Sequence, residues 1–222
     1  MTPDIDESLL PFAGLEGLAS VLQELALRKA RAVLAKLARP GDECSGQQTD
    51  KPGYGRTTVL AADTVVYLDE VLGKPRDSAE AFAMLTKLGG RTHFVLSAVA
   101  LIDFGAADGL LGRSAAAAAT AAAAAAAVGL AAAATAAATT TREASYCETA
   151  QVTFADYSPD AIKKYIADEA PFDKAGAYAI QGGWGQQVVA LTGELETVIG
   201  LPWQRLAKEL GQRGFAIASV PC

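Results

Sequence analysis

Residues 62–75, ADTVVYLDEVLGKP, decide the fold, because they join a β-branched apolar run to a turn that ends in Lys-Pro. The longer run 57–68 predicts a strand buried on both faces, as in a sheet covered by helices. Asp63 interrupts this strand, and a buried carboxylate costs free energy unless a partner or a metal ion offsets its charge. Lys74 follows just past the next turn and is a candidate partner.

The segments around this strand predict a mixture of helices and strands. Leu18, Leu22 and Leu25 form an apolar stripe at helical spacing, with Lys29 near its centre and Arg28 pointing away. Helices are predicted at 15–37, 78–88, 159–170 and 202–214, and strands at 57–68, 93–104 and 147–157, with one or two short strands within 176–193. The third strand is expected to pair antiparallel with the second. Without strict βαβ alternation, the pattern favours one α/β or α+β domain over residues 1–222.

An alanine-rich segment, at about 105–141, interrupts this domain. Alanine is only weakly apolar and the segment also holds threonines and a glycine, so a membrane span is not expected. Alanine has the highest helix propensity, which makes a transient helix the local expectation. We therefore predict a hairpin insertion that carries no chemistry.

Composition excludes several classes of function. The chain of 222 residues has a net charge of −6 and no cluster of lysines and arginines, which argues against a nucleic-acid surface or a polybasic membrane patch. Three cysteines without CxxC spacing and a single histidine, His93, argue against a disulfide framework, a zinc site or a Ser-His-Asp triad. The first residues, MTPDIDESLLPF, lack the features of a signal peptide, so a cytoplasmic location is expected.

Several polar residues lie where the pattern predicts burial or a tight backbone. They are Asp63, Thr64, Lys74, Lys29, Asp173, Lys174 and Gln181, with Asp6 and Glu7 near the start. Carboxylates bind hard cations through oxygen, lysines offset phosphate charge, and a carboxylate can deprotonate a water molecule. This set of side chains, without histidine, is typical of Mg²⁺-assisted phosphate chemistry.

Each residue also has a simpler interpretation. Asp63 could be a structural carboxylate bound by backbone amides, and Lys29 could extend its ammonium group from an apolar helix face to water. Lys74 could be a solvated turn residue, Gln181 could satisfy backbone groups, and Glu7 could be an ordinary surface residue. Taken singly, none of these residues decides between the two interpretations.

Together, the motifs resemble the Maf family of nucleoside triphosphate pyrophosphatases. The matching stretches are DIDES (4–8), LALRKA (25–30), AADTVVYLDEVLGKPRDSAEAFAML (61–85), LGGRTHFVLSAVAL (88–101), VTF (152–154), YIADEAPFDKAGAYAIQGGWG (165–185) and GLP (200–202). The resemblance implies a mixed elongated sheet flanked by helices, two lobes with a central cleft, and a homodimer. It also implies hydrolysis of a nucleoside triphosphate between the α and β phosphates, with a divalent cation, Mg²⁺ or Mn²⁺.

The resemblance also assigns roles to individual residues. Asp63 matches the proton acceptor, and Asp63 and Glu7 are the candidate metal ligands. Thr64 and Gln181 match positions tied to substrate choice, and Glu7, Lys29 and Lys74 match polar residues that line the cleft. The motifs DTVV and AYAIQG are similar to those of the family branch that hydrolyses dTTP and UTP.

Two departures from the family pattern leave an alternative open. The sequence starts at the position equivalent to the family's DES stretch. We therefore expect the family's first strand and the SxSPRR-like loop after it to be missing. In the family, the serine and arginines of this loop would bind the triphosphate. Thr197 stands where the family has asparagine before VxGLP. The alternative to an active enzyme is a catalytically impaired domain that binds nucleotide or a partner in cell-division control.

Overall fold

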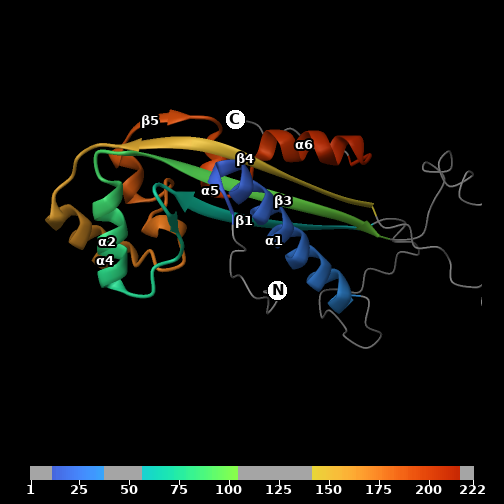
Figure 1. The fold of residues 1–222 in the computed structure, drawn as a ribbon, viewed down its shortest axis with the longest axis horizontal. Coiled ribbons are helices and arrows are strands. Elements are labelled where there is room, and N and C mark those ends of the chain that lie inside the picture. Colours follow the sequence, from blue (N-terminus) through green and yellow to red (C-terminus); the bar gives the residue numbers. More distant parts are fainter. Residues whose placement is uncertain (1–11, 38–56, 105–141, 216–222) are drawn as a thin grey trace, which may run out of the picture. The chain divides into compact units, whose positions relative to one another are not determined.

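The computed structural model describes residues 12–37, 57–104 and 142–215 (Figure 1). Glu7 and the alanine-rich segment lie outside these ranges. The described chain divides into two compact units: residues within 29–60 and 101–144 form one, and those within 6–28, 61–100 and 145–222 form the other. Most of the predicted site residues belong to the second unit.

A five-stranded sheet has the order β2-β1-β3-β4-β5. Its strands are β1 (Thr57–Tyr67), β2 (Val71–Leu72), β3 (Thr92–Phe104), β4 (Arg142–Phe154) and β5 (Val188–Thr192). The pairs β1/β2 and β4/β5 are antiparallel. The Thr92 and Thr153 hydroxyls lie 2.8 Å apart, so the start of β3 meets the end of β4 and these strands also run antiparallel. The predicted pairing of the second and third strands is thereby confirmed.

The predicted helices are present, with capping residues that explain where they begin. They are α1 (Gly14–Leu37), α2 (Ser78–Leu88), α4 (Pro159–Glu169) and α6 (Trp203–Gln212). The Asp77 carboxylate accepts the Glu80 N–H at 2.8 Å, and the Ser158 hydroxyl accepts the Ala161 N–H at 3.2 Å. Four short elements were not predicted: β2, the helix α5 (Leu195–Ile199) and the two 3₁₀ turns Ala175–Ala177 and Gly183–Gln187. The range 176–193 therefore holds one strand, β5, preceded by turns.

Apolar side chains from the sheet and two helices form the core of the second unit. In it α2 and α4 pack against each other, as Figure 1 shows. The core includes Val66, Leu85, Val95, Val152, Phe154, Ile162, Tyr178 and Trp184. Leu18, Leu22 and Leu25 of α1 are also buried, which confirms the stripe predicted from their spacing. The mixed α/β fold expected from the sequence is present.

The loop after α4 is fastened to the β1–β2 hairpin at Gly176. Its N–H donates to the carbonyl of Gly73 at 3.0 Å, and its φ is +68°, a left-handed conformation that favours glycine. A Cβ at this position would lie 2.9 Å from Cγ2 of Val66. Only a residue without a side chain can bring this loop so close to β1.

We expect Gly176→Ala to lower the free energy of unfolding by about 2 kcal/mol, from left-handed strain and overpacking against Val66. Urea unfolding measures this change. Gly211→Ala is the control, because no atom beyond its chain neighbours and the backbone of its own helix lies within 4 Å of the added Cβ. The control should leave stability unchanged or raise it by up to about 1 kcal/mol. Equal stability of Gly176→Ala and wild type would contradict the close packing at Gly176.

Candidate active site

Asp63 lies half-buried in the middle of β1. Strand side chains alternate between faces, so Asp63 shares a face with Val65 and Tyr67. The Tyr67 ring meets the ring of Phe12, just before α1, at 6.5 Å between centroids. Val65 and Val66 are both buried, which confirms the predicted two-sided burial there, whereas residues 61–64 keep partial exposure. The carboxylate therefore occupies a partly accessible position beside a buried segment.

Thr64 projects from the opposite face of β1. Its Oγ1 lies 2.8 Å from Oγ of Ser97 in β3, and the Ser97 hydroxyl donates to the carbonyl of Thr197 in α5 at 2.7 Å. Gly200 also packs close to Thr64: a Cβ added at Gly200 would lie only 3.2 Å from Thr64 Oγ1. Thr64 thus belongs to a hydrogen-bonded junction of β1, β3 and α5. The sequence brings Asp63 and Thr64 together, but the strand places them on different faces.

The edge of β1 beside these two residues has no strand partner within the described ranges. β2 pairs only with Val66 and Tyr67, opposite Leu72 and Val71. On that side no described strand reaches Asp63 or Thr64. Within the described residues, this edge of β1 is therefore not covered by another strand.

Lys74 lies near an acidic and a basic residue of the loop after α4. Lys174 forms an ion pair with Asp173, and this hydrogen bond holds the pKa of the Asp173 carboxyl below its usual value. The charge of Lys74 acts in the same direction. Lys74 is exposed, so its ammonium group is available to an anionic ligand. The structure thereby brings the GKP and DKAGAY motifs together.

Gln181 is exposed in a turn whose backbone is tied down on both sides. The Ala179 N–H donates to the Tyr165 hydroxyl at 3.1 Å, and the Gly183 N–H donates to a carboxylate oxygen of Glu169 at 2.6 Å. A Cβ at Gly185 would lie 2.1 Å from the carbonyl oxygen of Ile180. The glycines of GGWG therefore allow close backbone packing, and the same turn presents Gln181 to solvent.

His93 lies fully buried, beneath this same region. Its Nε2 is 2.8 Å from the Tyr178 hydroxyl, and the Phe154 ring packs against both side chains at 4.9 Å between centroids. Burial lowers the pKa of His93 to about 4, so the imidazole is neutral at pH 7. His93 is thus a fully enclosed side chain that holds Tyr178 in place.

The remaining predicted residues are placed only in part. Lys29 lies half-buried on α1 and belongs to the other compact unit, while Arg28 pairs with Glu24 at 3.2 Å, off the apolar stripe. Within the described residues, no three histidine, cysteine or acidic side chains are grouped so that they could hold a metal ion. Of the predicted metal ligands, Asp63 is in the described part and Glu7 is not.

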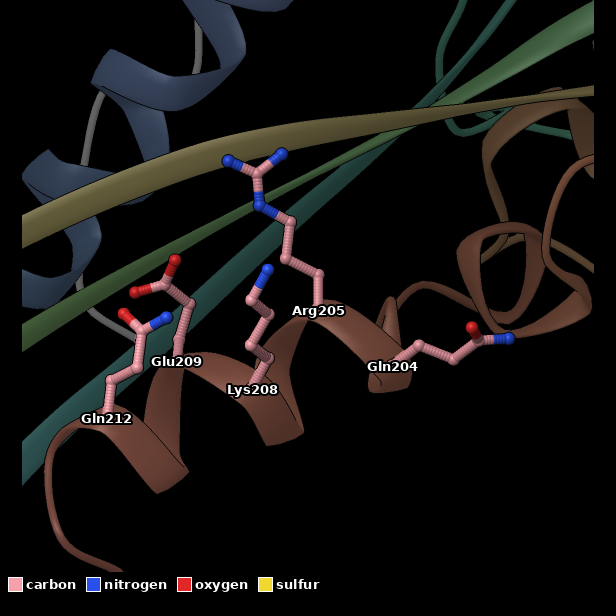
Figure 2. Close-up of a pocket in the computed structure, with 5 residues that line it drawn as sticks. All are labelled: Gln204, Arg205, Lys208, Glu209 and Gln212. Atoms are coloured by element: carbon pink, nitrogen blue, oxygen red, sulfur yellow. The ribbon is translucent and has the colours of Figure 1, made fainter.

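A polar groove of about 470 Å³ lies along α6, lined by Gln204, Arg205, Lys208, Glu209 and Gln212 (Figure 2). Arg205 pairs with Glu148 of β4 at 2.8 Å and covers the Tyr146 ring, 4.6 Å from its centroid. None of the predicted site residues lines this groove. It is therefore distinct from the candidate site on β1.

Sequence reasoning missed Ser97, Thr197 and Tyr178 as parts of the site. Ser97 is the only hydroxyl in the run VLSAVALI, and a hydroxyl in such a run needs a hydrogen-bond partner when buried. That signal was present. The partner, a backbone carbonyl 100 residues away, could not be identified without the fold.

Comparison with known proteins shows the family to which this chain belongs. The sequence profile of the family described as "Maf-like protein" matches residues 1–213. The chain belongs to the Maf-like family. Three relatives of this Maf-like chain are each named dTTP/UTP pyrophosphatase. That of Symbiobacterium thermophilum is 32% identical and spans 97% of this chain and 82% of its own length. Those of Shewanella denitrificans and Burkholderia thailandensis are each 36% identical, over 91% and 90% of this chain and 76% and 75% of their own lengths.

The helices in the described ranges of the Maf-like chain were also compared with the requirements of a membrane span. None combines the necessary length and hydrophobicity.

The buried His93 predicts a pH dependence of stability. Its folded-state pKa, about 4, lies below the ordinary 6.5, so between these values the unfolded chain binds a proton that the folded Maf-like chain excludes. Stability should fall by up to about 3 kcal/mol as pH drops from 6.5 to 4. Urea unfolding across this range, with His93→Gln as the comparison, isolates the effect. Identical pH slopes for the two proteins would contradict it.

Proposed function

We propose that this chain hydrolyses dTTP and UTP between the α and β phosphates, releasing the nucleoside monophosphate and pyrophosphate. The observation that carries the proposal is the family match over residues 1–213, together with relatives at 32–36% identity that are named dTTP/UTP pyrophosphatase. The half-buried carboxylate on β1 and the exposed lysine beyond the hairpin add chemical support.

In this proposal Asp63 accepts the proton of the attacking water. A carboxylate within hydrogen-bond reach of a bound water can take its proton as the water attacks. The backbone of Asp63 is fixed by the surrounding strand, in which Val65 and Val66 are buried. A fixed base contributes through orientation as well as through proton transfer.

Lys74 and Lys29 are the proposed phosphate contacts. A triphosphate carries several negative charges, and ammonium groups stabilise the charge that develops on the leaving pyrophosphate. Lys74 already acts on the carboxylate of Asp173 through its charge. A bound triphosphate would compete with Asp173 for this lysine.

A divalent cation is part of the proposal, with Asp63 and Glu7 as its protein ligands. Mg²⁺ binds substrate phosphates together with one or two carboxylates and keeps several waters, so a dedicated cluster of three protein ligands is not required. The absence of such a cluster among the described residues is compatible with this mode of binding. When bound, the ion would polarise the phosphate oxygens.

Thr64 and Gln181 are proposed to select the base. A pocket that hydrogen-bonds one base discriminates strongly, because the wrong base leaves polar groups unpaired. The exposed Gln181 amide can both donate and accept, and the Thr64 hydroxyl is fixed in its junction. A cytoplasmic, homodimeric protein without a nucleic-acid partner completes the proposal.

Asp63→Asn should lower kcat for dTTP and UTP by about 100-fold or more, since the amide cannot accept the proton. Pyrophosphate release measures the loss. Asp69→Asn is the matched control, because Asp69 is an exposed carboxylate that pairs with Arg91 at 2.9 Å. The control should retain wild-type turnover. If Asp63→Asn turns over nucleotide as fast as wild type, Asp63 is not the base. If wild type binds nucleotide but does not hydrolyse it, the alternative of a catalytically impaired domain is favoured.

Removal of divalent cations with EDTA should abolish pyrophosphate release, and added Mg²⁺ or Mn²⁺ should restore it. A thermal unfolding curve in the same buffers distinguishes loss of cofactor from loss of fold. Full turnover in excess EDTA would overturn the proposed cofactor.

A further inference from the structure

The buried Ser97 hydroxyl has only one proton to donate. Ser97 is fully enclosed, and its Oγ lies 2.7 Å from the Thr197 carbonyl oxygen and 2.8 Å from Thr64 Oγ1. A carbonyl can only accept, so the Ser97 proton must point to Thr197. Ser97 can then only accept from Thr64. The direction of both hydrogen bonds follows from this count of protons.

The Thr64 hydroxyl is consequently restricted to one role toward any ligand. Its proton is held by Ser97, and its remaining lone pairs can only accept. Thr64 keeps partial exposure, and Gly200 next to its Oγ1 has no side chain to cover it. A ligand group that approaches this oxygen must therefore be a hydrogen-bond donor.

We propose that Ser97 is a specificity-determining positioning residue, which fixes Thr64 as an acceptor and so selects bases that carry a ring N–H. This inference rests on the proposed function, in which Thr64 contacts the base. Uracil and thymine present N3–H, a donor, whereas N3 of cytosine is an acceptor. Cytosine would bring two acceptors together and leave both unpaired, which disfavours it.

The orientation of Ser97 is itself supported by the backbone of α5. The Thr197 N–H donates to the Glu194 carbonyl at 3.1 Å, and the Gly200 N–H donates to the Glu196 carbonyl at 3.0 Å. Thr197 is buried, so water does not compete for its carbonyl. Any loss of the Ser97 hydroxyl frees Thr64 to rotate and to donate its own proton.

The test compares kcat/KM for UTP and CTP in wild type, Ser97→Ala, Thr64→Val and the double variant. Ser97→Ala should lower the UTP-to-CTP ratio about tenfold, the value of one net hydrogen bond. Thr64→Val should lower it similarly, and the double variant should show no further loss, because Ser97 acts only through Thr64. Ser145→Ala is the matched control: the Ser145 hydroxyl on β4 donates to Gln23 rather than to Thr64 or Ser97, so the ratio should not change.

Circular dichroism and thermal unfolding identify variants that fail to fold, and the nucleotide dissociation constants of each folded variant supply a second readout of the ratio. An unchanged ratio in folded Ser97→Ala, or a further fall in the double variant, would overturn the inference while the proposed function stands. Wild type that neither hydrolyses nor binds UTP would overturn both.

Discussion

Consecutive side chains of a strand point to opposite faces, and this constraint separates Asp63 from Thr64 in β1. The two residues are neighbours in sequence and differ in surroundings. Asp63 lies on the face where Tyr67 meets Phe12, whereas Thr64 lies on the face of Ser97 and α5. A nucleotide that uses both must reach around the edge of β1 beside them, where no strand of the described chain is paired. Base selection and water activation can then be carried by different faces of one strand.

The segment that carries Lys174 and Gln181 depends on buried contacts beneath it. Gly176 packs against Val66, and Tyr178 is hydrogen-bonded to the neutral His93. The hydroxyl of Tyr165, a residue of α4, accepts a hydrogen bond from the Ala179 N–H. These contacts reach β1, β3 and α4 in turn, so the segment is fixed to three elements of the second unit. Because its backbone is already held, this segment loses little further backbone entropy when its exposed side chains bind a ligand.

Regular elements with strong local signals could be predicted from the sequence. The leucine stripe of α1 and the apolar strands β1 and β3 follow from periodicity, and the Ser158 cap from its place before Pro159. For α2 the sequence allowed either Asp77 or Ser78 as the cap, and the structure has Asp77. The 3₁₀ turns around Gly176 and Gly183 were not predicted, because they depend on contacts with Val66 and Glu169 from distant parts of the chain. The same holds for the partners of Ser97 and His93. The sequence analysis treated Asp63 and Thr64 together as polar residues of one strand, and their separation onto opposite faces of β1 follows from the strand itself.

The account is tested most directly by a crystal structure of the chain with Mg²⁺ and α,β-methylene-UTP, whose bridging carbon resists hydrolysis. We predict polyphosphate oxygens beside the Asp63 carboxylate and the uracil N3–H within hydrogen-bond distance of Thr64 Oγ1. A nucleotide bound elsewhere, such as along the groove of α6, or with its base turned away from Thr64, would contradict the division of roles between the two faces of β1.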